Sequence, residues 1–237
     1  MKLGKRLQTI AALVDFHYDH IWDCCCDHGL LGAALLSKQV APHIHFVDRV
    51  SELMHALEQK LARFFPVDPQ VASSPWQVHC MDVADLPLQN TPGKHLVIIA
   101  GVGGDLMAEL VAAICHRNPA VDIDFLLCPV HHHFMLRQQL IQLEFNLKAE
   151  TLLVENYRFY EVMLVSSDPN NACAINPVGS AIWQGDTDEQ IKIATDYLAK
   201  TLGHYKRMQL QKNNPDVQPI IVAYSAVVIK NRKEIIG

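Results

Sequence analysis

The sequence predicts an α/β fold in which a Rossmann-like sheet of seven strands is followed by a C-terminal helical hairpin. Three observations lead to this prediction. Short apolar segments alternate with segments whose apolar residues recur at helical spacing. Several of the apolar segments end in an acidic residue or a glycine, as strands do where ligands gather at the carboxyl edge of a parallel sheet. A segment rich in breaker residues near position 170 separates this pattern from two helix-like stretches.

Five strands and a final hairpin are expected before that segment, and helices between them. The predicted strands are 20–24, 43–48, 76–82, 95–102 and 124–129, with two more meeting near 157–160 within 148–167. The predicted helices are 3–16, 33–38, 51–65, 105–115 and one that ends near Phe145. The pair Lys5-Arg6 is expected to face away from the apolar stripe of the first helix.

The breaker-rich segment from Asp168 to Ser180 is interpreted as a domain boundary, with a sheet domain at 1–168 and a helical, coiled-coil-like appendage at 169–237. In the appendage, Thr187 and Gln190 form a capping box ahead of a helical stripe. Apolar residues from 217 to 228 follow the 3.6 period and predict a second helix. A terminal strand is the alternative for this last stretch.

Composition bounds the class of protein. The chain has 237 residues, half of them hydrophobic, which suffices for one α/β domain and a small appendage. No apolar run approaches the roughly 20 residues that span a bilayer, and no signal-peptide core is present, so we expect a cytoplasmic protein that does not enter membranes. Seven cysteines, an odd number, do not form a disulfide framework and agree with a reducing compartment.

Charge is unevenly distributed along the chain. The net charge is −5, yet residues 200–237 contain seven basic residues against two acidic ones. The basic residues are Lys200, Lys206, Arg207, Lys212, Lys230, Arg232 and Lys233. A basic appendage on an acidic body predicts a surface that faces RNA, and a solvated helix face is the alternative.

Acidic residues close three successive predicted strands. Asp23, Asp48 and Asp82 would line up along one edge of the sheet, which suits a ligand with an amino group, a ribose and an adenine ring. Asp48 is expected to accept hydrogen bonds from the ribose diol. The alternative for Asp48 is to cap the helix that begins near Ser51, a role that Ser51 could fill itself.

A glycine cluster, Gly101-Val-Gly-Gly104, follows the fourth predicted strand. Glycines here permit a positive φ and a close approach of substrate to backbone. The cluster lacks the lysine and the Ser/Thr of a Walker loop, which argues against nucleoside triphosphate hydrolysis.

Two runs of potential metal ligands are present, Cys24-Cys-Cys26 and His131-His-His133. Adjacent side chains point in different directions, and no Cys-x-x-Cys or His-Glu-x-x-His motif accompanies them. We therefore expect no bound metal.

Several motifs together resemble a known family, the bacterial tRNA adenine-N1 methyltransferases that act at position 22. They are Lys5-Arg6-Leu7 with Ile10-Ala11, Asp23-x-x-x-Asp27-His28-Gly29, Ile99-Ala-Gly-Val-Gly-Gly104, Pro129 before Leu136-Arg137, and Tyr160-Glu161. The resemblance covers residues 3–167, and beyond residue 170 only the general plan agrees. It implies a class I fold dependent on S-adenosyl-L-methionine (SAM), tRNA as partner, and a monomer.

The resemblance also implies roles for individual residues. The SAM site would comprise Asp23, Cys25, Gly29, Asp48, Met81, Asp82, Ala100 and Gly101. Asp27, oriented by His28, would be the catalytic carboxylate that stabilises the methylated, cationic adenine. The RNA substrate would contact Gly103, Gly104, Lys206, Arg207 and Lys212. For Asp27, the alternative is a cap on the helix that begins near Gly29.

The sequence departs from the family pattern after the first strand. Cys25 stands in place of a glycine, Cys26 in place of a serine, and Val102 in place of the usual methionine. A Cβ at position 25 crowds the methionine part of SAM. A SAM-binding protein without catalysis, and a methyltransferase that acts on a small molecule, are therefore the alternative functions.

Overall fold

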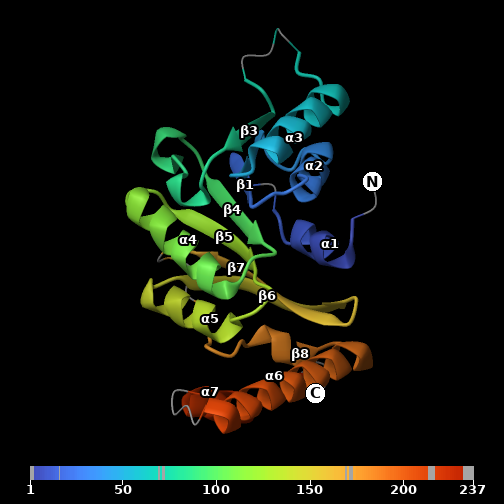
Figure 1. Ribbon diagram of the computed structural model, residues 1–237, viewed down its shortest axis with the longest axis vertical. Helices are drawn as coiled ribbons and strands as arrows, with labels where there is room; N and C mark the ends of the chain where they lie inside the picture. Colours follow the sequence, from blue (N-terminus) through green and yellow to red (C-terminus); the bar gives the residue numbers. More distant parts are fainter. Residues whose placement is uncertain are drawn as a thin grey trace.

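A seven-stranded sheet forms the centre of the molecule, with the strand order β3-β2-β1-β4-β5-β7-β6 (Figure 1). The structure is a computed structural model that describes all residues except 1–2, 16, 69, 71–72, 169, 171–172, 213–216 and 232–237, and it leaves out the side chains of 211 and 212. The strands are β1 (His20–Cys24), β2 (His43–Asp48), β3 (Trp76–Cys80), β4 (His95–Ala100), β5 (Ile123–Cys128), β6 (Asn146–Glu155) and β7 (Arg158–Ser166). The Rossmann-like sheet expected from the sequence is confirmed.

The direction of the strands fixes where a ligand can bind. β1 to β5 are parallel, and β7 is antiparallel to both β5 and β6. The strand order reverses between β1 and β4, so the chain leaves these two neighbours in opposite directions. The carboxyl ends of β1 and β4 therefore flank the crevice in which such sheets bind ligands.

Helices cover both faces of the sheet (Figure 1). On one side lie α1 (Lys5–Ala12), α2 (Leu30–Ser37) and α3 (Ser51–Phe64), and on the other lie α4 (Gly104–Arg117) and α5 (His133–Gln142). Alternate residues of β4 serve the two cores, since Leu96 and Ile98 pack toward α1–α3 and Val97 and Ile99 toward α4 and α5. Two short 3₁₀ turns, η1 (Val83–Asp85) and η2 (Leu88–Asn90), complete the α4 side.

The strand ends differ slightly from the predicted ones, in a way that affects the site. β3 ends at Cys80 and β4 at Ala100, two residues earlier than expected in both cases. Asp82 is therefore the N-cap of η1, and Gly101 to Gly103 form the turn before α4. The β6–β7 hairpin turns at Asn156 and Tyr157, whose positive φ values of 50° and 62° are those of the tight turn that matches strand twist.

Arg137 and Glu161, from two of the motifs that resemble the family, belong to a buried hydrogen-bond network at the β6–β7 edge of the sheet. Arg137 of α5 donates to Glu150 of β6 and Glu161 of β7 at 2.7 Å each, and all three side chains are fully buried. Tyr197 donates to the other oxygen of Glu161 at 2.6 Å. Because a buried charge that loses its partner is strongly destabilising, this network fixes the packing of α5 against the hairpin.

The C-terminal appendage packs beneath the β6–β7 edge (Figure 1). It comprises η3 (Ala181–Trp183), β8 (Gln184–Gly185), α6 (Asp188–Lys212), α7 (Gln218–Ser225) and β9 (Lys230–Asn231). The capping box is confirmed, since Gln190 N donates to Thr187 Oγ1 at 3.3 Å and Thr187 N to Gln190 Oε1 at 3.2 Å. The predicted second helix is too long at its end, because the chain leaves α7 at Ser225 and β9 then pairs with β8.

An apolar cluster joins the appendage to the sheet domain. It includes Trp183, Tyr197 and Tyr224, against which Phe134 of α5 and Phe159 of β7 pack. The division at residue 168 stays a prediction. Among the described residues, no helix combines the length and the apolar character needed to cross a membrane.

Candidate active site

A cavity of about 350 Å³ opens at the carboxyl edge of β1 to β4. Its lining is Cys25, Asp48, Arg49, Met81, Asp82, Val83, Val102, Leu106 and Leu110. The structure thus brings together four residues of the predicted SAM site, from three different strand ends. The other five lining residues were not among those predicted for the SAM site. Leu106 and Leu110 carry a signal, because the spacing i, i+4 places both on one face of α4.

The loop after β1 is held in an unusual backbone conformation. Cys25, Asp27 and Gly29 all have positive φ, at 54°, 51° and 66°. A Cβ on Gly29 would lie 2.6 Å from Leu57, so glycine is required there by packing as well. A left-handed residue other than glycine costs about 1 kcal/mol, which Cys25 and Asp27 each incur. Strain of this kind gathers at functional sites.

Asp23 lies beneath the loop rather than in the cavity. It is 5% exposed, and its Oδ2 accepts a hydrogen bond from Gly32 N at 2.8 Å. Gly32 belongs to the first turn of α2, whose N–H groups otherwise lack partners. Burial raises the pKa of the Asp23 carboxyl to about 7. Asp23 is not among the residues that line the cavity, and it anchors α2 to β1 through Gly32 N. Its predicted contact with the methionine part of SAM stays a prediction.

Asp48 and Asp82 do face the cavity, and both also accept backbone hydrogen bonds. Asp48 accepts from Asp27 N and from Val50 N, each at 3.2 Å, so it ties the β1 loop to the end of β2. Asp82 accepts from Ala84 N at 2.9 Å. Neither Asp48 nor Ser51 caps α3, whose N-cap is Val50 without a side-chain bond. A carboxylate has about four acceptor positions, so both keep capacity for a ligand.

Two carboxylates, those of Asp48 and Asp82, and one guanidinium, that of Arg49, belong to the residues that line the cavity, so the lining has a net negative charge. The pKa of the Cys25 thiol rises to about 11, first because of burial and then because of the carboxylates Asp48, Asp23 and Asp82, with Arg49 opposing. This thiol is therefore neutral at pH 7 and is not a nucleophile. A cavity lined by two acceptor carboxylates, with a net negative charge, suits a ligand that carries a hydroxyl pair and cationic groups.

Asp27 and His28 are exposed at the mouth of the β1 loop. His28 Nε2 lies 3.7 Å from Asp27 Oδ1, and both side chains are more than half exposed. Helix α2 begins after Gly29 without any side-chain cap, so the capping alternative for Asp27 is not supported. The pair is free to meet a substrate that approaches this edge.

The glycine turn after β4 packs closely against the histidine run that follows β5. A Cβ on Gly103 would lie 2.3 Å from the His131 ring, and one on Gly104 would lie 2.6 Å from His132 O. Gly104 N also donates to His131 O at 2.9 Å. Gly103 and Gly104 therefore make room for the segment between β5 and α5, and the Gly104 N–H is not free for a substrate base.

A cluster of three potential metal ligands lies beside this turn. Atoms of Asp105, His131 and His132 lie within 4.8 Å of one another, and all three side chains are exposed. The premise that adjacent histidines point apart is wrong for this pair. His132 has a φ of 58°, and this left-handed conformation turns both rings toward Asp105. His133 is half-buried and begins α5.

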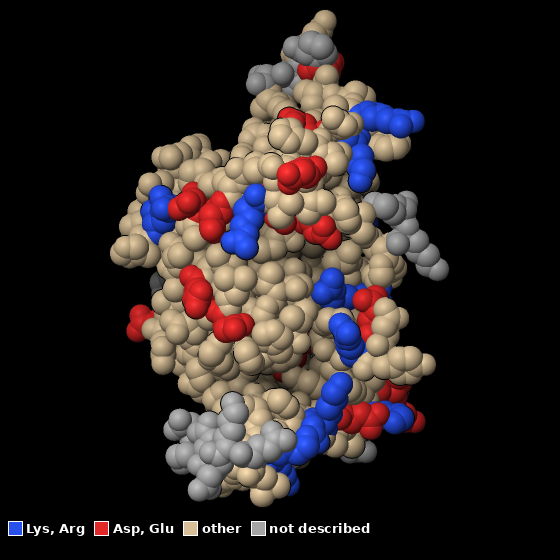
Figure 2. Space-filling model, viewed as in Figure 1, with Lys and Arg blue, Asp and Glu red and all other residues tan. Residues whose placement is uncertain are grey.

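The predicted RNA-binding residues of the appendage lie on α6. Lys206 and Arg207 are exposed there, and the side chain of Lys212 lies outside the described residues. On the face in Figure 2, basic side chains gather along the right side of the view, from the level of α3 past α1 to α6, with acidic ones between them.

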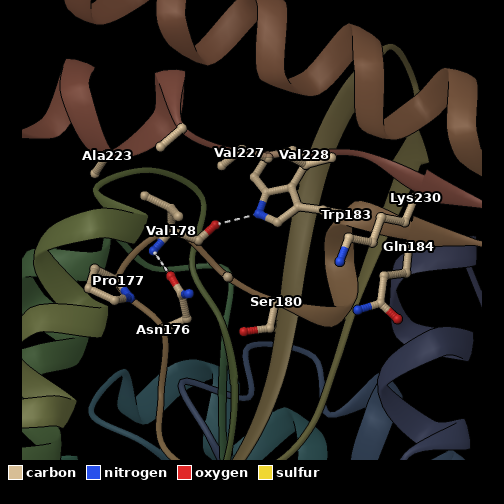
Figure 3. Close-up of a pocket in the computed structure, with 12 residues that line it drawn as sticks. Asn176, Pro177, Val178, Ser180, Trp183, Gln184, Ala223, Val227, Val228 and Lys230 are labelled. Atoms are coloured by element: carbon tan, nitrogen blue, oxygen red, sulfur yellow. Dashed lines mark hydrogen bonds between the residues drawn. The ribbon is translucent and has the colours of Figure 1, made fainter.

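A second cavity, of about 490 Å³, lies in the appendage near Trp183, Val227 and Lys230 (Figure 3). Its lining contains no carboxylate. The indole N–H of Trp183 is already bonded to Val178 O at 2.8 Å. Its polar side chains are those of Asn176, Ser180, Gln184 and Lys230, and it contains none of the residues predicted for the SAM site.

Comparisons with known proteins find solved structures of the same fold. Several match nearly the whole chain, and two examples follow. They are M. capricolum TrmK with S-adenosyl-homocysteine (15% identity, 95% of this chain and 97% of that one, TM-score 0.71) and the B. subtilis m1A22 tRNA methyltransferase TrmK (18%, 94% of both, 0.63).

Magnesium protoporphyrin IX methyltransferase from Synechocystis covers less of the chain, at 13% identity over 68% of this chain and 79% of that one, with a TM-score of 0.52. No curated protein matches the chain. The sequence profile of a methyltransferase domain matches residues 3–163, which include every residue that lines the cavity at the carboxyl edge. The chain is a member of this methyltransferase domain family.

Proposed function

We propose that the protein transfers a methyl group from SAM to N1 of an adenine in tRNA, with position 22 as the target. The observation that carries this proposal is the extent of the structural likeness. The TrmK structures cover at least 94% of the chain, appendage included, whereas the small-molecule methyltransferase covers 68%. An appendage shared with enzymes that act on tRNA supports RNA as the substrate class.

The residues at the carboxyl edge fit SAM. Asp48 would accept hydrogen bonds from the ribose, Asp82 from the adenine amino group, and Met81 would pack against the adenine ring. Cys25 and the loop to Gly29, with Ala100 and Gly101 at the end of β4, would hold the methionine part. The net negative charge of the cavity lining supports SAM as the ligand, because SAM carries a sulfonium and an ammonium group. Asp23 would act indirectly, by fixing α2 and the loop.

Asp27 is the residue that we propose for the chemical step. SAM supplies an electrophilic methyl group, whose bond to sulfur breaks as the bond to adenine N1 forms, so that the positive charge passes to the base. The target adenine must leave its stack to bring N1 into line. The carboxylate of Asp27 would stabilise the cationic ring and could accept a proton from its amino group, with His28 orienting it.

The RNA would bind to Lys206, Arg207 and Lys212, away from the cavity. Gly103 and Gly104 would contribute to the site by making room for the segment that follows β5. Replacing the three basic residues by glutamate should abolish tRNA binding in a gel shift and leave SAM binding unchanged. An unchanged gel shift would remove α6 from the RNA surface. We predict that the protein acts as a monomer in the cytoplasm.

The direct test is methyl transfer to unmodified tRNA transcripts, followed by mass spectrometry of the digested product. The proposal predicts one N1-methyladenine, at position 22, and its loss from the tRNA of cells that lack the protein. Methylation of a small molecule without any transfer to tRNA would favour a small-molecule methyltransferase. SAM binding without transfer to any acceptor would favour a SAM-binding protein without catalysis.

A further inference from the structure

Arg6 occupies a position that the sequence argument did not anticipate. Lys5 is exposed as expected, but Arg6 is half-buried and its guanidinium lies over the ring of Tyr160, with Cζ 5.2 Å from the ring centroid. Its Nη1 and Nη2 lie 3.5 and 3.9 Å from the point where a Cβ on Gly101 would stand. Three motifs far apart in the chain, from α1, from the end of β4 and from β7, therefore meet at Arg6.

The charge of Arg6 has no anionic partner in the part of the chain that the structure describes. The Glu155 carboxylate accepts a hydrogen bond from the backbone N of Arg6 at 3.2 Å. Among the described residues, no ion pair joins this carboxylate to the Arg6 guanidinium. A guanidinium carries five N–H donors in a rigid fork that matches the oxygens of a phosphate. Tyr160 supplies a flat surface that holds the fork in one orientation.

The location of Arg6 relates it to the methyl-transfer site. Gly101 and Val102 are neighbours in the turn after β4, yet Val102 lines the cavity on the α4 side and Gly101 lies under Arg6 on the α1 side. With φ at 90°, Gly101 has a conformation that favours glycine, and the missing side chain leaves its surface open. A nucleotide that approaches this turn from the α1 side meets Arg6 first.

We propose that Arg6, held by Tyr160 above Gly101, binds a phosphate of the RNA next to the adenine that is methylated. This inference rests on the proposed function and deepens it. Arg6 is a positioning residue in this account, because it would hold the RNA backbone and would not touch the reacting atoms. An enzyme without it should bind SAM normally and hold the target nucleotide poorly.

The test compares Arg6→Met with Lys5→Met, which removes the same charge one residue away on the same helix. Methyl transfer to tRNA is measured over a range of tRNA concentrations, and tRNA binding over a range of salt concentrations. We expect kcat/KM for tRNA to fall about thirtyfold or more in Arg6→Met and less than threefold in Lys5→Met. The slope of log Kd against log salt should become shallower by about 0.7 to 0.9, as expected for one lost phosphate contact.

Further measurements distinguish phosphate binding by Arg6 from a purely structural role. SAM affinity, measured by calorimetry, should be unchanged in Arg6→Met. Arg6→Lys should recover part of the salt dependence, and Tyr160→Leu should mimic Arg6→Met. If Arg6→Met does not fold, Arg6→Lys and Tyr160→Leu carry the test. Wild-type protein that transfers no methyl group to tRNA would refute the proposed function itself. Active wild type with an Arg6→Met variant that matches Lys5→Met in kcat/KM and in salt slope would overturn only the role of Arg6.

Discussion

The two ends of the central strands differ in what their polar side chains do. A row of histidines lies on the α4 face of the sheet, at the first residues of β1 and β4 and farther along β2 and β3. His45 forms 3.0 Å contacts between ring nitrogens with both His20 and His79, and Trp22 stacks on it at 3.8 Å between centroids. At the carboxyl ends, Asp27 and His28 are exposed, and Asp48 and Asp82 keep acceptor capacity beside a cavity.

The histidine row is internally satisfied. Trp22 Nε1 donates to His95 Nδ1 at 3.1 Å, and His95 Nε2 lies 2.8 Å from Thr91 O. Burial lowers the pKa of His20, His79 and His95, and it lowers that of His45 to about 3, with the neighbouring histidines adding to the effect. Neutral rings that bond to one another stabilise the fold. The strained loop and the carboxylates at the other end serve a ligand.

The largest effect that we expect concerns the histidine row. These histidines have folded pKa values below the unfolded value of about 6.5, so their stabilising contribution is present above that pH and is lost as the pH falls. For His45, whose folded pKa is about 3, the contribution to the free energy of unfolding should fall by about 5 kcal/mol as the pH drops from about 6.5 to about 3, at about 1.4 kcal/mol per pH unit. The contributions of His20, His79 and His95 should change in the same direction, as urea unfolding at several pH values would measure.

His45→Gln sharpens this prediction, because glutamine keeps hydrogen-bonding groups and does not titrate. As the pH falls, the free energy of unfolding should decrease less steeply in the variant than in the wild type. The two slopes should differ by the uptake of about one proton on unfolding. Identical pH slopes would show that His45 does not stay neutral in the folded protein.

Asp23 should show the opposite pH dependence at the other end of the same strand. Its folded pKa of about 7 exceeds the unfolded value of about 3.9, so its contribution is present at low pH and is lost as the pH rises from about 4 to 7. Asp23→Asn should gain stability over the wild type across that range, by about 4 kcal/mol in total, and the difference should stay constant above pH 7. A difference independent of pH would contradict the raised pKa.

Asp27→Asn tests whether the exposed pair serves chemistry rather than structure. The amide keeps the shape of the side chain and removes the charge. We expect methyl transfer to fall about a hundredfold, in the range of acid/base groups, with an unchanged melting temperature. Full activity in this variant would leave Asp27 without a chemical role.

The sequence identified most of the sheet because its signals are local. Short continuous apolar runs such as 95–100, bounded by turn residues, favour central strands. The capping box at Thr187 indicates a helix start without help from tertiary contacts. The acidic residues at the strand ends led to the right edge of the sheet for the same reason.

Features that depend on tertiary contacts could not be predicted from local patterns. Nothing near Asp23 indicates that its carboxyl would bond to Gly32 N, and nothing near Gly103 indicates that His131 would pack on it. The histidine row had a detectable signal, because His20 and Trp22 alternate in phase with His43 and His45 on paired strands. Arg6 was missed because helical periodicity assigned it to the solvent, whereas Tyr160 covers it.

The carboxyl edge as a SAM site is the central claim, and calorimetric titration of S-adenosylhomocysteine tests it most directly. The wild type should bind with measurable heat. Cys25→Gly should bind more tightly, because it removes a side chain from the cavity, and the relief of left-handed strain should raise its stability by about 1 kcal/mol. Cys25→Phe should not bind, since its ring would fill the cavity. No heat with either the wild type or Cys25→Gly, or equal affinity in all three proteins, would contradict the account.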